Sequence, residues 1–139
     1  MKWRIDFYLS INQDFTIKIF EYYIIFNKKE KELEVSIIRE KVIHLSFQHN
    51  GNESDEINLY ANALCNSLDF FTNCKVNLFS KNIFITNTIN EWFEKVSQNH
   101  ESWRLAREKC NEKNIELIAY TIYNKDNEEI VNGLVNKTS

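Results

Sequence analysis

Apolar and polar residues alternate along the first third of the chain, as they do in strands that bury one face. Over 3–10 the apolar positions are Trp3, Ile5, Phe7 and Leu9. The same period of two recurs over 15–26 and over 32–48, where it fits either one bent strand or two strands, 32–39 and 41–48. A polar run at 49–52 then breaks the pattern. We therefore predict an antiparallel meander of strands at the start of the chain.

Helical spacing replaces this alternation after residue 53. Apolar residues recur every three or four positions between an N-cap at Ser54 and Asn73, as in an amphipathic helix. The rest of the chain predicts a strand at 74–79, helices at 82–96 and 101–113, a strand at 115–123 and a last helix capped by Asp126 or Asn127. Helical crossovers normally make the strands that they join parallel. We expect an α/β fold with a mixed sheet of five strands, in the order βββ-α-β-α-α-β-α, with 3–10, 74–80 and 115–123 adjacent and parallel.

The composition fits one globular domain over 1–139. Of the 139 residues 43% are hydrophobic and 14% aromatic, which is enough for one core. No apolar run could span a bilayer, and the N-terminus is too charged for a signal peptide. Cys65, Cys74 and Cys110 have no metal-ligand spacing and are typical of a reducing compartment. We therefore expect a cytoplasmic protein with no membrane partner.

Charge and residue spacing restrict the ligands that this chain could bind. The net charge of −3 gives no overall electrostatic support for binding phosphates. With no proline and two glycines, the chain has no Gly-rich phosphate loop. We interpret His44, His49 and His100 as structural or surface residues, because no two of them have the spacing of metal ligands. These features predict no bound cofactor.

The stretch from Phe79 to Trp92 is the most informative part of the sequence. An apolar strand ends there, turns at Ser80-Lys81-Asn82 and continues as a helix, which is where open α/β sheets place their sites. The stretch resembles the ribonuclease H family, in which an apolar strand is followed by T-D-S and a helix of the form x-F-x-x-N-G-I-x-x-W. The residues that match this helix are Phe84, Asn87, Ile89 and Trp92. Lys81 stands where the family has a metal-binding aspartate.

Three further stretches carry the same resemblance. Residues 56–64 are similar to the family's E-x-x-A-x-x-x-A-L helix, with Glu56 at its catalytic glutamate. Trp103 lies in a helix that contains Leu and Ala and follows the second helix, as a tryptophan of the family does. Residues 127–135 resemble N-E-x-A-D-x-L-A, and one extra residue brings Asn132 onto the family's aspartate, which would otherwise correspond to Val131.

The resemblance implies a ribonuclease-H-like fold and a site at the ends of the first and fourth strands. In that family four carboxylates hold two divalent cations, which clamp the attacking and leaving oxygens while the RNA strand of an RNA–DNA hybrid is cleaved. Here the corresponding positions are Leu9, Glu56, Lys81 and Asn132, so only Glu56 keeps a carboxylate. We therefore expect a degenerate member of the family, catalytically inactive and with no metal, that binds nucleic acid (RNA–DNA hybrid or RNA) or a protein partner.

Two alternatives remain open. The chain could be an active nuclease, requiring Mg²⁺ or Mn²⁺, in which Asp6 or Asp14, alone or with Asp126, completes a rearranged site around Glu56. It could instead be an unrelated α/β interaction module.

Ordinary structural roles are open for the same residues. Glu56 could simply be a first-turn glutamate that favours the helix dipole. Lys81 could bind phosphate, pair with Glu56 or remain a solvated turn residue. We expect the tryptophans Trp3, Trp92 and Trp103 to lie in the core.

Overall fold

Five strands form one mixed sheet in the order β3-β2-β1-β4-β5. The structure is a computed structural model that describes residues 20–48, 53–123 and 125–138. The strands are β1 (Glu21–Lys29), β2 (Glu32–Ile38), β3 (Val42–Gln48), β4 (Cys74–Ser80) and β5 (Ile115–Thr121). β1, β2 and β3 pair antiparallel, whereas β4 pairs parallel with both β1 and β5. The predicted element order and the five-stranded mixed sheet are therefore confirmed.

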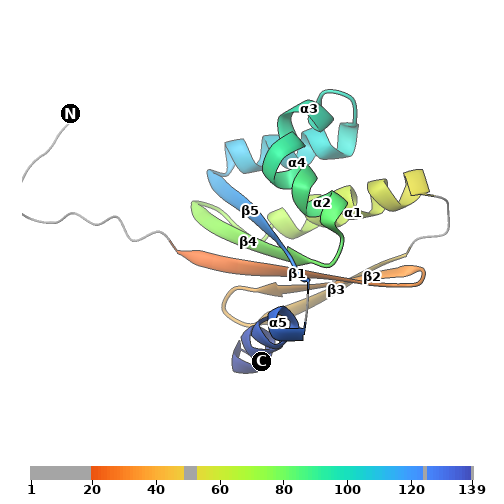
Figure 1. Ribbon diagram of the computed structural model, residues 1–139. Coiled ribbons are helices and arrows are strands. Elements are labelled where there is room, and N and C mark those ends of the chain that lie inside the picture. Colours follow the sequence, from red (N-terminus) through yellow and green to blue (C-terminus); the bar gives the residue numbers. More distant parts are fainter. Residues whose placement is uncertain (1–19, 49–52, 124, 139) are drawn as a thin grey trace, which may run out of the picture.

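The helices are divided unequally between the two faces of the sheet (Figure 1). They are α1 (Glu53–Leu68), α2 (Ile83–Asn87), the π-helix η1 (Thr88–Trp92), α3 (Phe93–Ser97), α4 (Glu101–Glu112) and α5 (Lys125–Thr138). α1 to α4 cover one face, and α5 lies alone on the other. Within the described residues, no helix has both the length and the apolar character needed to cross a membrane.

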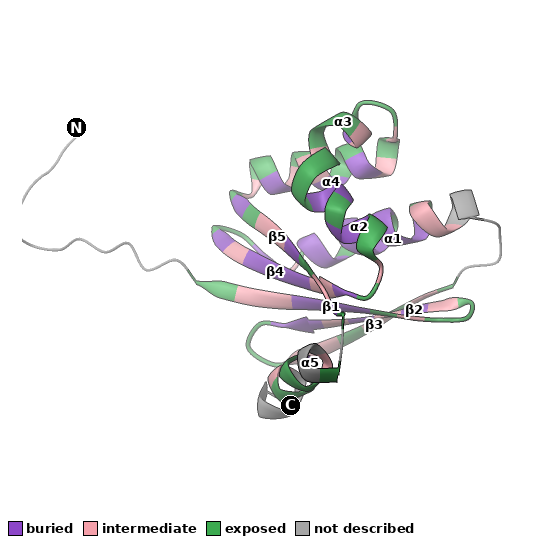
Figure 2. Ribbon diagram, viewed as in Figure 1, coloured by how far each residue is buried: buried purple, intermediate pink, exposed green. Residues whose placement is uncertain are grey.

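Each face of the sheet buries its own apolar cluster. In Figure 2 the buried residues, in purple, recur along the strands and along α1 and α4. The main core lies under α1 and α4 and includes Leu33, Leu64, Leu78 and Trp103, each at most 1% exposed. Burying a side chain of this size contributes roughly 1.5–3 kcal/mol. The smaller cluster under α5 consists of Ile25, Ile38, Ile122 and Val131. α5 therefore covers only part of its face, and the polar remainder of that face stays open.

The first strand of the sheet is not the one that the alternation pattern predicted. β4 is flanked by β1 and β5, so residues 3–10 cannot be its neighbour, and that prediction was wrong. The predicted strand 15–26 is displaced toward 21–29, and 32–48 forms two strands. β1 runs to Lys29, beyond the predicted strand end at residue 26, and Glu30 turns the chain with a φ of 37°. Residues 3–10 lie outside the described residues.

Two asparagines turn the chain from helices into the parallel strands. Asn73 precedes β4 and Asn114 precedes β5, with φ values of 50° and 56°. Asparagine adopts this left-handed region more readily than other residues with a Cβ atom. The amide of Asn114 also donates to Asn73 Oδ1 at 3.2 Å, so the two turns hold each other beside the first residues of β4 and β5.

The helix after β4 contains a π turn that changes which residues are buried. The sequence predicted one regular helix over 82–96 with Trp92 on its apolar face. The extra residue of η1 instead brings Phe93 onto the face of Ile85 and Ile89, and Trp92 is 48% exposed. The expectation that Trp92 lies in the core was therefore wrong, whereas Trp103 is buried as expected.

The same π turn places Asn90 against the outer edge of β5. Asn90 Nδ2 donates to the carbonyl oxygen of Ala119 at 2.8 Å, and Asn90 Oδ1 accepts from the Ala119 N–H at 2.8 Å. The side-chain amide thus makes the two bonds that a neighbouring strand would make, and it covers this edge against pairing with other chains.

Asn90→Ala should lower the free energy of unfolding by about 1–3 kcal/mol, since two backbone groups of β5 lose their partner. Denaturant unfolding of the full chain measures this change. Asn87→Ala is the matched control, because Asn87 is exposed on the same helical segment and makes no cap hydrogen bond. Equal stability of the two variants would show that Asn90 contributes nothing at this edge.

Candidate functional site

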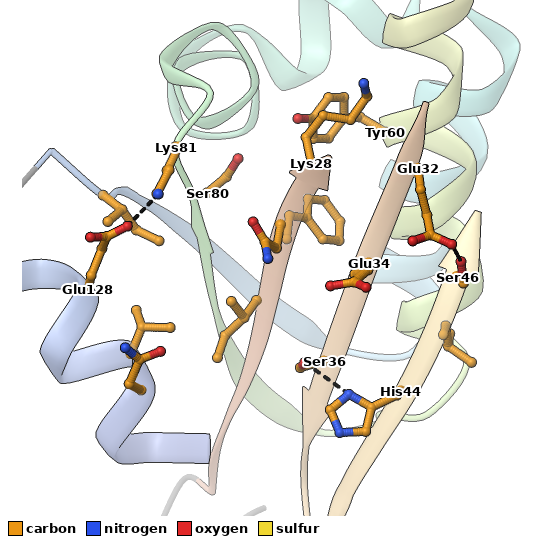
Figure 3. Close-up of a pocket in the computed structure, with 17 residues that line it drawn as sticks. Lys28, Glu32, Glu34, Ser36, His44, Ser46, Tyr60, Ser80, Lys81 and Glu128 are labelled. Carbon is orange, nitrogen blue, oxygen red and sulfur yellow. Dashed lines mark hydrogen bonds and ion pairs between the residues drawn. The ribbon is translucent and has the colours of Figure 1, made fainter. Parts of the chain in front are cut away.

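A groove of about 900 Å³ lies on the side of the sheet that α5 covers only in part (Figure 3). Along β2 and β3 it is lined by Glu32, Glu34, Ser36 and His44. At one end it reaches the ends of β1 and β4. We call this end the strand-end hollow and define it by five residues: Lys28, Tyr60, Ser80, Lys81 and Glu128.

The turn after β4 aims Lys81 into the hollow. Ser80 Oγ accepts from the N–H of Asn82 at 3.1 Å, and Asn82 Oδ1 accepts from the N–H of Ile85 at 3.2 Å as the N-cap of α2. These bonds hold the predicted turn at 80–82 at both ends. The side chain of Lys81 therefore leaves the sheet at a defined point.

Lys81 forms an ion pair with Glu128 of α5 across the mouth of the hollow (Figure 3). Their side chains are 63% and 40% exposed, so the pair contributes little to stability, on the order of 0–1 kcal/mol. Among the ion pairs of the described residues Glu56 faces Lys28 instead, with Lys28 Nζ and Glu56 Oε1 at 4.0 Å. The pairing of Lys81 with Glu56 that the sequence allowed is not found.

Tyr60 lies one helical turn after Glu56 and closes the floor of the hollow. The side chain is 3% exposed. Burial raises the pKa of Tyr60, and the negative charge of Glu56 raises it further, whereas hydrogen bonds with the side chains of Asn82 and Ser80 act in the opposite direction. The phenol therefore stays protonated at neutral pH and joins α1 to the turn after β4.

The structure brings together only some of the residues that the sequence singled out. Lys81 lies at the hollow, and Glu56 lies beside it through Lys28. Asn132 lines the groove and is exposed, whereas Val131, on the same helix, is 6% exposed and packs against the sheet in the cluster with Ile25 and Ile38. The proposed ligands Leu9, Asp6 and Asp14 lie outside the described residues, and so does the side chain of Asp126.

The strand end next to Lys81 belongs to β1 rather than to residues 3–10. β1 pairs with β4 from Glu21 with Lys75 to Ile25 with Phe79, so Asn27 lies at the position expected of the first site residue. Assigning Leu9 to that position followed from the wrong choice of first strand. The side chain of Asn27 is an amide, so placing Asn27 instead of Leu9 at this position adds no carboxylate to the site.

Three residues of the hollow were missed from the sequence. Glu128 lies four residues before Asn132 on the same helix, and Tyr60 lies four after Glu56, so helical spacing could have indicated both. Lys28 was missed because the predicted strand 15–26 ends before it, whereas β1 runs to Lys29. No local signal marks a lysine at a strand end as part of a site.

The histidines lie apart from one another. His44 is exposed on β3, where its Nδ1 lies 3.2 Å from Ser36 Oγ, and His100 precedes α4. His49 lies outside the described residues.

The residues of the hollow do not fit two divalent cations. In the described part of the chain, no three His, Cys, Asp or Glu side chains are grouped so that they could hold a metal ion. The ammonium groups of Lys28 and Lys81 accompany the two nearby carboxylates, and they would repel a second positive charge. The hollow therefore balances Glu56 and Glu128 with lysines, where the family resemblance implied metals.

The topology matches what the resemblance implied. The first three strands form a meander, β4 and β5 join it through helical crossovers, and the last helix crosses the opposite face. The element order and the mixed five-stranded sheet are those that the resemblance implied. The carboxylate set differs at the positions named above.

Comparisons with known proteins found similarity only among solved structures. No family model matches the sequence, and no curated protein matches it. LC11 ribonuclease H1, solved in complex with an RNA/DNA hybrid, is 15% identical with a TM-score of 0.48, over 84% of this chain and 96% of that one. Ribonuclease H1 from the halophilic archaeon Halobacterium salinarum is 12% identical with a TM-score of 0.47, over 84% and 98%. The foamy viral protease-reverse transcriptase, in complex with an RNA/DNA hybrid, is 12% identical with a TM-score of 0.48, over 96% of this chain and 24% of that one.

Replacing the lysine should create a cation site that the wild type lacks. In Lys81→Asp with Asn132→Asp, two new carboxylates join Glu128 at the hollow, so Mn²⁺ should raise the melting temperature. At about tenfold above its Kd the ion would stabilise the fold by roughly 1.4 kcal/mol. The measurement is thermal unfolding with and without millimolar Mn²⁺ or Mg²⁺.

The wild type should show no metal-dependent shift, and neither should Lys41→Asp, a control at the β2–β3 hairpin. A shift in the wild type, or none in the double variant, would contradict this account of the hollow.

Proposed function

We propose that this chain is a non-hydrolytic ribonuclease-H-like domain that binds a protein partner. The observation that carries the proposal is the pairing of Lys81 with Glu128 and of Lys28 with Glu56 at the strand-end hollow. Hydrolysis by two metals requires several carboxylates free to bind cations, and these two are already balanced by ammonium groups.

Charge favours a protein over a nucleic acid as the partner. The chain carries a net charge of −3, and Glu32 and Glu34 lie on the open part of the groove. Glu34 is paired with Lys29 at 3.1 Å, and Glu32 accepts a hydrogen bond from Ser46 at 2.6 Å, so the open face carries no excess of positive charge. Phosphate backbones are bound mainly through excess Lys and Arg.

Exposed apolar side chains next to the hollow supply a contact surface for a protein. Ile83 and Phe84 follow the turn at 80–82 and are 49% and 56% exposed. On the same helical segment Trp92 is exposed, with Lys95 Nζ 5.3 Å from its ring centroid. Exposed aromatic groups of this kind are enriched at protein interfaces.

The purified protein should not cleave an RNA–DNA hybrid above background with Mg²⁺ or Mn²⁺. Gel assays of a labelled hybrid measure this, with Glu56→Gln as the matched variant. Metal-dependent cleavage that disappears in Glu56→Gln would overturn the proposal and establish the active-nuclease alternative.

Binding assays separate the two classes of partner. By fluorescence anisotropy we expect no saturable binding of RNA, or of an RNA–DNA hybrid, at physiological salt up to about 100 µM protein, the weak end of non-specific nucleic-acid binding. A protein that forms a stoichiometric complex with the chain should lose affinity on Phe84→Asp and keep it on Leu105→Asp, an exposed control on α4. Tight, salt-dependent binding of nucleic acid would show that the partner class is wrong.

A further inference from the structure

The two flanks of α5 differ in character. Glu128 points into the groove on one side of the helix (Figure 3). Val131, three residues later, packs against the sheet. Because a helix turns by about 100° per residue, Ile130 lies on the flank opposite to Glu128, and it is 59% exposed. The flank away from the groove therefore carries an apolar side chain.

Aromatic side chains of three neighbouring strands lie on the same face of the sheet. Tyr23 of β1 and Phe79 of β4 border the apolar cluster under α5, and their ring centroids are 6.4 Å apart. Tyr120 of β5 continues this row, with its ring stacked on Phe79 at 5.2 Å. Tyr120 is 42% exposed, and Ile118, two residues before it on the same face, is partly exposed. We call Tyr23, Phe79, Ile118, Tyr120 and Ile130 the aromatic face.

The aromatic face has the dimensions of a short helix. From β1 to β5 is two strand spacings, about 10 Å, and an α-helix with its side chains is about 10–12 Å wide. β5 rises about 13 Å from Glu116 to Tyr120, which equals two to three helical turns. Among the described helices only α5 lies on this side of the sheet (Figure 1). A second helix beside α5 would extend this layer over β4 and β5.

Charged side chains lie at one end of the aromatic face. Glu21, Lys75 and Glu116 are in register on β1, β4 and β5, on the same face as Ile118. Lys75 Nζ lies 3.9 Å from Glu21 Oε1, and Glu116 is exposed. The row carries one negative charge in excess, which favours a basic residue in an occupant and disfavours the phosphates of a nucleic acid.

We propose that the aromatic face binds an amphipathic helix of a partner protein. The helix lies beside α5, with its apolar stripe on Tyr120 and Ile130 and a lysine or arginine opposite Glu116. Exposed tyrosines that are held in place by stacking are typical contact residues of such interfaces. The surface at Ile83 and Phe84 belongs to α2 on the opposite side of the sheet, so the two surfaces are separate.

A synthetic amphipathic peptide tests the proposal on the full chain. The labelled probe has about 15 residues, with leucines at helical spacing and lysines beside them. By fluorescence anisotropy we expect saturable binding with a Kd of about 100 µM or tighter. A peptide of the same composition in scrambled order should not bind, because it has no apolar stripe.

Two variants locate the binding surface. Tyr120→Asp and Ile130→Asp should each raise the Kd about tenfold or more, since each places a carboxylate against the leucine stripe. Leu105→Asp on α4 is the matched control, because Leu105 is 43% exposed, and it should leave the Kd unchanged. Phe84→Asp should leave it unchanged as well. Thermal unfolding of each variant shows that the sheet is intact.

Reversing one charge tests the direction of the contact. Glu116→Lys should raise the Kd of the lysine peptide about threefold or more, and it should favour a peptide with glutamates in place of the lysines. No saturable binding to the wild type, or a Kd that Tyr120→Asp and Ile130→Asp leave unchanged, would overturn the proposal. A dimer in sedimentation that Tyr120→Asp dissociates would also overturn it, because the occupant would then be a second copy of the chain.

Discussion

The parallel pairing of β1 with β4 is the constraint on which the rest of this structure depends. It brings the ends of two strands that lie far apart in the chain to one edge of the sheet, where Lys28 and Lys81 leave the backbone. α1 crosses to that place with Glu56 and Tyr60, and α5 returns to it with Glu128. The hollow therefore depends on the order of the strands in the sheet.

At the hollow, lysine side chains of the protein itself balance the negative charges of the carboxylates. Carboxylates grouped at a strand end repel one another and normally need a cation. Here each of two carboxylates meets an ammonium group on another element, at distances where partly exposed pairs are weak. Both carboxylates therefore have a counter-charge within the protein, and the groove beside them is polar and accessible.

The π turn in the helix after β4 has two consequences for the surface of the protein. The π turn at 88–92 moves Asn90 to the β5 edge and at the same time exposes Trp92. One local insertion therefore protects an edge and exposes an aromatic side chain. Such π turns are common at functional positions, and here the structural consequence is visible in two hydrogen bonds.

The sequence by itself determined the element order and the turn at 80–82, because these depend on local periodicity and spacing. The family resemblance selected Glu56, Lys81 and Asn132, and the structure places Lys81 and Asn132 along the groove and Glu56 beside Lys28. The sequence placed the first strand wrongly, since 3–10 alternates regularly whereas 21–29 contains five consecutive apolar residues from Tyr22 to Phe26, and pairing partners are not local. Tertiary structure decided which segment is the first strand, and with it that Asn27 replaces Leu9 at the strand end. It also decided that Lys81 meets Glu128, because an ion pair between β4 and α5 depends on how α5 crosses the sheet, which no spacing within either segment records.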